Sequence, residues 1–216
     1  MKRIFSRKAV IAMSLALCVR VPGQYISDDT YARYELLAPE SHQFKIYYEV
    51  TEPKPGARFY FNPIREGSIA TNESAMDRAT GAPLKLEVVT GAQAKADDPA
   101  QDFDAAGKYL KVHFAHVVPA DGEYRLAITK TYKDDKSYFK EGEMIVFTRT
   151  LSIPHDSVVL PPGYEVVFCS VAAQVLIEPD GRLKLSFVNP GSGADLGVTI
   201  RARRLPAGDK KSEATR

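Results

Sequence analysis

The sequence predicts an all-β protein, folded as an antiparallel β-sandwich of about eleven strands. Apolar and polar residues alternate along most segments between residues 30 and 200, which is the period of a strand with one buried and one solvated face. Proline and glycine interrupt these segments at roughly ten-residue intervals. Beyond residue 23 we find no helical period of useful length.

The first strands show the alternation most clearly. Between residues 44 and 50, Phe44, Ile46 and Val50 point to one face, and Lys45 and Glu49 point to the other. Prolines at positions 53 and 55 end this strand. Further strands are expected at 58–61, 68–76 and 84–88.

The longest interruption is GAQAKADDPAQDFDAAG, residues 91–107, which is rich in alanine and aspartate. Such a segment is either a long loop or a boundary between two sheets. We therefore expect one β-sandwich domain over residues 24–205, with a sub-boundary near 91–107.

Strands are also expected at 110–114 and 124–129, followed by a polar loop over 132–140. The segment DGEY, residues 121–124, resembles a tyrosine corner, in which the Tyr124 phenol would bond to the chain upstream. An ordinary tight turn before a strand has the same pattern. The corner favours an immunoglobulin-like Greek key, and a saddle-like arrangement is the alternative.

Residues 141–188 form the densest series of alternations, and they contain a hairpin. Residues 175–177 lead into the turn EPDGR and return as residues 183–187. Pro179 fixes φ early in the turn, and Asp180 with Gly181 tolerates positive φ. A last strand is expected at 196–200, and residues 206–216 form a flexible polar tail.

The first 23 residues follow the pattern of an export signal. Five basic residues and no acid flank or precede an 11-residue apolar run, residues 9–19, which is shorter than the about 20 residues of a membrane-spanning helix. A cleaved signal peptide is therefore expected over 1–23, with a periplasmic or extracellular protein as the product. Cys18 offers a lipid anchor, but the bulky Leu17 before it argues against lipidation.

Charge and cysteine content narrow the class further. Removing the five basic residues of the leader from the total of 29 leaves 24, against 27 acidic residues, a net charge of −3. No basic stripe with interleaved aromatics remains, so nucleic acid is not an expected partner. Beyond the leader Cys169 is the only cysteine, which precludes an internal disulfide there and suits a small buried side chain.

The histidines do not form a recognisable catalytic or metal site. His113 and His116 are three apart, so on one strand they would point to opposite faces. His155 and Asp156 precede Ser157, but neighbours in a turn cannot reach the geometry of a catalytic triad, and a turn is the preferred interpretation.

Other motifs are equally weak. Four aspartates at 97, 98, 102 and 104 are typical of a calcium loop, but Ala106 and His113 stand where ligands are needed, so a solvated acidic loop is preferred. Gly191-Ser192-Gly193 precedes no helix, as a nucleophile elbow would require. We predict no catalytic, cofactor or metal residues, and an enzyme is not favoured.

Tyrosines provide the remaining candidate for a site. Tyr31, Tyr34, Tyr47 and Tyr60 lie in the first strands, and side by side they would form a platform for a sugar or a peptide. The absence of tryptophan disfavours a carbohydrate. The alternative is a tyrosine-rich interface between sheets, which is the preferred interpretation.

Residues 124–151 and 158–190 resemble the non-catalytic N-terminal β-domains of exported bacterial peptidases of the M1 and M61 type, and stand-alone secreted β-proteins. The resemblance spans residues 30–205 and implies a saddle-like or sandwich β-domain. The zinc motif H-E-x-x-H of those peptidases is absent, so no catalytic residue is transferred.

Three functions remain as hypotheses. The first is a non-enzymatic exported β-sandwich that binds or scaffolds a protein or envelope component. The second is an accessory domain that acts beside a separately encoded peptidase or transporter. The third is a hydrolase that uses His116 or His155 with nearby acids.

Overall fold

The structure, a computed structural model, describes residues 29–189 and 195–206. The predicted signal peptide with Cys18, Gly191 to Gly193 and all but the first residue of the predicted tail lie outside these residues. Within the described ranges no helix is long and apolar enough to cross a membrane.

The predicted all-β class is confirmed, but the described residues form fifteen strands rather than about eleven. The extra strands are short, and pairing with a neighbouring strand defines them more than alternation does. The large sheet has the order β13 (Gln174–Ile177), β14 (Leu183–Val188), β11 (His155–Val159), β1 (Tyr31–Leu36), β2 (Gln43–Glu52), β8 (Tyr124–Lys133), β4 (Ile69–Asp77) and β5 (Pro83–Leu84).

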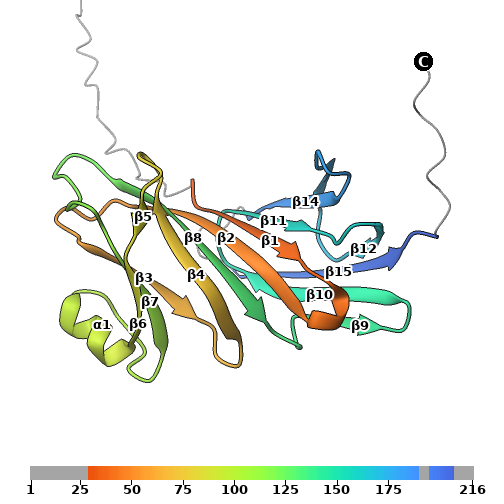
Figure 1. The fold of residues 1–216 in the computed structure, drawn as a ribbon, viewed down its shortest axis with the longest axis horizontal. Coiled ribbons are helices and arrows are strands. Elements are labelled where there is room, and N and C mark those ends of the chain that lie inside the picture. Colours follow the sequence, from red (N-terminus) through yellow and green to blue (C-terminus); the bar gives the residue numbers. More distant parts are fainter. Residues whose placement is uncertain (1–28, 190–194, 207–216) are drawn as a thin grey trace, which may run out of the picture.

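Two smaller sheets complete the fold. One has four strands, in the order β12 (Tyr164–Cys169), β15 (Leu196–Arg204), β10 (Met144–Leu151) and β9 (Tyr138–Glu141). The other has three strands, in the order β3 (Phe59–Ile64), β7 (Lys108–His113) and β6 (Leu86–Thr90). In Figure 1 the three-stranded sheet lies toward the left and the four-stranded sheet toward the right.

Both small sheets pack on the same face of the large sheet, because β2 and β8 contribute to two separate cores. Phe44 of β2 and Tyr132 of β8 belong to the core under the four-stranded sheet. Val50 and Leu126, on the same faces of these strands, belong to the core under the three-stranded sheet. The single buried face that the alternation predicts is therefore covered by two different sheets, one over each half.

Aromatic rings fill the centre of the first core. The Phe44 ring meets the rings of Phe147 at 5.5 Å and Tyr132 at 6.1 Å between centroids, both in edge-to-face geometry. Such contacts add to the burial of large apolar area. This core fixes the distance between β10 and the large sheet.

The predicted hairpin at 175–187 is confirmed as β13 and β14. Ile177 pairs with Leu183, and the Glu178 amide donates to the Arg182 carbonyl at 2.8 Å. Gly181 has a φ of +82°, which a glycine adopts without steric cost.

The polar composition of segment 132–140 predicts a loop. In the structure only the middle of the segment is one. Tyr132 and Lys133 end β8, and β9 begins at Tyr138. The turn between them is held by Asp134, whose carboxylate accepts hydrogen bonds from the amides of Lys136 and Ser137. One side chain thus allows a polar sequence to return directly into a strand.

The predicted turn at His155 and Asp156 is also wrong, because both residues begin β11. This strand pairs with β1 in parallel, the one parallel pair among the described strands. His155 is exposed, Asp156 is buried on the opposite face, and the Ser157 hydroxyl bonds to the Tyr31 hydroxyl at 2.7 Å. Strand geometry therefore places the Asp156 carboxylate on the face opposite to the side chains of His155 and Ser157, so the three groups cannot form a triad.

The alanine-rich segment 91–107 connects β6 to β7, which pair with each other, and it contains a helix, α1 (Gly91–Asp97). Thr90 and Gln93 form a capping box that starts the helix. The sequence pattern does not predict α1, because seven residues without an apolar stripe give no helical period. A short 3-10 turn, η1 (Pro39–Ser41), connects β1 to β2.

Candidate functional site

A cleft lies on the large sheet between the two small sheets. Because these sheets cover different halves of the same face, they leave an opening of about 340 Å³ between β3 and β10. Its lining comes from all three sheets. The residues that carry its chemistry are Tyr34, Tyr48, Tyr60, Asn62, Lys130 and Arg149.

Lys130 occupies a core-facing position of β8. It follows Leu126 and Ile128 in the alternation, and it is only 5% exposed. Its ammonium donates to the Asn62 side-chain oxygen and lies 4.8 Å from the centre of the Tyr132 ring. Burial, with the positive charge of Arg149, lowers the pKa of Lys130 to about 8.

Arg149 occupies the equivalent position on β10, between the buried Phe147 and Leu151. Its guanidinium lies 5.5 Å from the centre of the Phe44 ring and 5.7 Å from that of Tyr34. It pairs with Asp134 at 3.5 Å, and both side chains are about one-tenth exposed or less.

Two phenols complete the polar lining. The hydroxyls of Tyr48 and Tyr60 bond to each other at 3.2 Å across the junction of β2 and β3. Burial raises the pKa of both phenols, so they keep their protons at neutral pH. Because one hydroxyl donates to the other, the pair has one proton left to donate to a bound group.

The buried charges of the cleft do not balance. Lys130 and Arg149 contribute two positive charges, and Asp134 contributes one negative charge. The neighbouring Asp156 adds a second negative charge only above its pKa of about 7. No acidic residue lines the cleft among the described residues. A buried charge is costly unless it is paired, so this arrangement is suited to an anion.

Asp156 lies beside this cleft, on β11. It faces the first core next to Ala32, a residue of the cleft lining, and it is 2% exposed. Neither carboxylate oxygen has a hydrogen-bond partner among the described residues. Burial raises the pKa of Asp156 to about 7, against the opposing effect of the Arg149 charge.

The structure brings two of the four predicted tyrosines together. Tyr34 and Tyr60 line the cleft, and Tyr34 is at the same time part of the first core. Tyr31 and Tyr47 lie on the opposite face of the large sheet, where the Tyr47 hydroxyl donates to Glu49 at 2.5 Å.

Sequence reasoning missed Lys130, Arg149 and Asp156. The available signal is a charged residue at a position that continues an apolar alternation. Lys130 follows this rule in β8 and Arg149 follows it in β10, each two residues from a buried apolar neighbour. Such a charge must be paired, must shift its pKa or must meet a ligand.

The histidines and the acidic loop have ordinary local partners. His113 bonds to Glu87 at 2.8 Å, and His116 bonds to the Val117 carbonyl at 3.0 Å. Lys54 and Lys111 pair with Asp98 and Asp97, each at 2.7 Å. In the described residues no three metal-ligating side chains of histidine, cysteine, aspartate or glutamate gather in one place.

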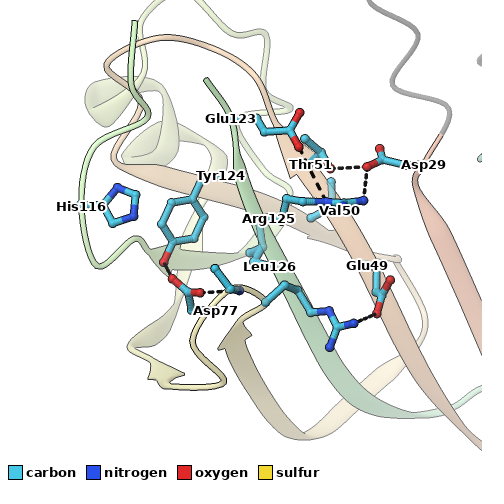
Figure 2. A pocket seen from close by; sticks show the side chains of 12 residues that line it. Asp29, Glu49, Val50, Thr51, Asp77, His116, Glu123, Tyr124, Arg125 and Leu126 are labelled. Carbon is cyan, nitrogen blue, oxygen red and sulfur yellow. Dashed lines mark hydrogen bonds and ion pairs between the residues drawn. The ribbon is translucent and has the colours of Figure 1, made fainter. Parts of the chain in front are cut away.

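A second recess, shown in Figure 2, is lined by two arginines and four carboxylates. Arg125 pairs with Asp29 and Glu123, and Arg78 pairs with Glu49. Its carboxylates outnumber its arginines by two, so this recess has an excess of negative charge, opposite in sign to that of the cleft.

The recess contains the predicted tyrosine corner. The Tyr124 hydroxyl accepts from the Ala115 amide at 3.2 Å, nine residues upstream, and donates to the buried Asp77 at 2.6 Å. The phenol thus bonds back to the chain as expected. It also joins β8 to the last residue of β4.

Removing this hydroxyl should destabilise the fold. We expect Tyr124→Phe to lower the free energy of unfolding by about 1–2 kcal/mol, because a buried carboxylate loses a donor and a backbone amide loses its acceptor. Urea denaturation measures the change. Tyr47→Phe, which removes a hydroxyl from the opposite face of the sheet, is the control and should cost less; an equal cost for both would contradict the assignment.

Comparisons with known proteins provide no family for this chain. No family model matches the sequence, and no curated protein matches it. Among solved structures, an aminopeptidase N family protein from Idiomarina loihiensis has a TM-score of 0.46 and 8% sequence identity. The match covers 80% of this chain and 29% of that one, so this chain spans less than a third of that protein, and the similarity is weak.

Proposed function

We propose that this protein is an exported, non-enzymatic β-sandwich that binds a protein or envelope component through the cleft between its two small sheets. The supporting observation is the unbalanced positive charge at Lys130 and Arg149, on strand positions that otherwise hold apolar residues. Natural proteins retain such destabilising groups where a ligand needs them. If the bound protein is a separately encoded peptidase or transporter, the chain acts as its accessory domain.

Export is tested by fractionating bacterial cells that produce the full chain with a C-terminal tag. We expect the tagged protein outside the cytoplasm, shortened by about 23 residues, because the first 23 residues carry the pattern of a signal peptide. Mass spectrometry locates the cleavage site. A cytoplasmic protein that keeps residues 1–23 would contradict export.

Lys130→Met tests whether the buried ammonium destabilises the folded protein. At pH 7 we expect this variant to be more stable than the wild type by about 1–2 kcal/mol, because the folded state holds the ammonium with a lowered pKa of about 8. The gain should disappear between about pH 8 and pH 10.5, because in this range the wild-type lysine has lost its proton in the folded state but still keeps it in the unfolded state. Thermal unfolding over this pH range measures it.

The same variant should lose its partner. Immobilised wild-type protein is incubated with an envelope extract, and captured components are compared with those on Lys130→Met and Lys133→Met. Lys133 is exposed on the same strand, so its replacement changes the net charge equally. Capture by the wild type and Lys133→Met but not by Lys130→Met is expected. Equal capture by all three, or no capture, would count against a binding role for the cleft.

A further inference from the structure

We propose that the ligand group held in the cleft is an organic carboxylate, bound between Lys130 and Arg149. This inference rests on the proposed binding function and names the chemistry of its ligand. It follows from the charge of the cleft, from the donors that face it and from the apolar walls beside them.

The charge of the site matches a single negative charge. Lys130 and the largely buried Arg149 are opposed by Asp134, which leaves an excess of one positive charge as long as Asp156, whose pKa is about 7, keeps its proton. Arg65 also lines the cleft, but it is exposed, so water screens its charge. A carboxylate carries the one charge that is needed, whereas a phosphate group near its second ionisation would exceed it.

The donors of the site are placed for a small planar anion. Asn62 already binds the Lys130 ammonium through its side-chain oxygen, so two of the three ammonium protons remain for other acceptors. The guanidinium of Arg149 presents several donors in one plane, and charge-assisted bonds of this kind are among the strongest in proteins. The hydrogen-bonded pair of Tyr48 and Tyr60 adds one neutral donor within the same lining.

The walls of the cleft are suited to an organic body attached to the carboxylate. Ile46 and Tyr48 of β2 lie on the floor, and Ile153 lies on the side of the four-stranded sheet. The exposed residues Arg65 and Ser152 mark the rim toward solvent. A ligand can therefore enter with its carboxylate toward the buried cations and its apolar part against these walls.

Titration of the protein with matched probes tests the inference. N-acetylphenylalanine imitates the end of a peptide chain, 3-phenylpropionate is a free acid of similar size, and N-acetylphenylalaninamide is neutral. We expect at least one acid to bind about ten- to hundredfold more tightly than the amide, because the amide lacks the charge-assisted bonds. Two-dimensional NMR of the protein amides measures affinity and shows whether shifts occur on β2, β8 and β10.

Two variants locate the binding group. Lys130→Met should weaken acid binding about tenfold or more. Asn62→Asp places an internal carboxylate against the same ammonium with almost no change in shape, so it should compete with the ligand and weaken binding as well. Lys133→Met, which removes an exposed charge from the same strand, should bind the acids as the wild type does.

The outcomes separate the inference from the proposed function. Stronger binding of N-acetylphenylalanine than of 3-phenylpropionate identifies a peptide terminus as the source of the carboxylate, and the reverse identifies a free acid. Equal affinity for the acids and the amide, tighter binding of inorganic phosphate, or acid binding unchanged in Asn62→Asp would overturn the carboxylate. If envelope capture still depends on Lys130 in those cases, the binding function stands and only the ligand chemistry is wrong.

Discussion

Asp156→Asn is expected to raise the free energy of unfolding at pH 8 by about 2–4 kcal/mol. The wild-type carboxyl is buried without a hydrogen-bond partner in the part of the chain that the structure describes, and burial raises its pKa from 3.8 to about 7. Above that pH the folded protein holds an uncompensated negative charge in its core, apart from the attraction of Arg149. Asparagine has the shape of the protonated acid and never carries this charge.

The pH dependence gives this prediction its sign. Between about pH 4 and pH 7 the folded state keeps the Asp156 proton while the unfolded state has lost it, so wild-type stability falls as the pH rises through this window. The advantage of the asparagine variant should therefore be close to zero near pH 4 and largest above pH 7.

Urea denaturation of both proteins at pH 4, 6 and 8 measures the difference. Asp135→Asn serves as the control, since the side chain of Asp135 is exposed to solvent. The control should change stability by only a few tenths of a kcal/mol at each pH. A constant difference between wild type and Asp156→Asn over the three pH values would refute the account of a buried titrating acid.

Gly91→Ala should be the second large effect, a loss of about 3 kcal/mol in the free energy of unfolding. A Cβ atom at Gly91 would lie 1.7 Å from the Asp104 carbonyl oxygen and 2.6 Å from its carbon. Both are backbone atoms, so no rotation of a side chain relieves the contact. The Gly91 amide also donates to the Gly107 carbonyl at 2.9 Å, which holds the two ends of the segment together.

Gly197→Ala is the matched control, because a Cβ atom at this strand position has no other atom of residues 29–189 or 195–206 within 4 Å, apart from its chain neighbours. Its stability should equal or slightly exceed that of the wild type, since alanine restricts the unfolded chain more than glycine does. Hydrogen exchange should show early loss of protection in α1 and β6 for Gly91→Ala alone. A stability loss below 1 kcal/mol would show that segment 91–107 moves aside without cost.

Local sequence patterns predicted much of the fold and part of the site. The alternation around Phe44 and the proline–aspartate–glycine turn at 178–182 are each found where the sequence places them. Tyr34 and Tyr60 line the cleft, whereas the sequence left a choice between an exposed platform and the preferred interface between sheets. The helix α1 and the strand at His155 were not predictable, because the first depends on a capping box and the second on pairing with β1.

By itself the sequence determined that this chain forms strands, where most of them turn, and which faces are apolar, because these properties depend on neighbours within a few residues. Only the tertiary structure decided that one face of β2 and β8 is divided between two small sheets. That division brings Lys130 and Arg149 together, although 19 positions separate them along the chain. The physical reason is that charge balance in a buried site depends on contacts between distant strands, which alternation along one strand does not specify.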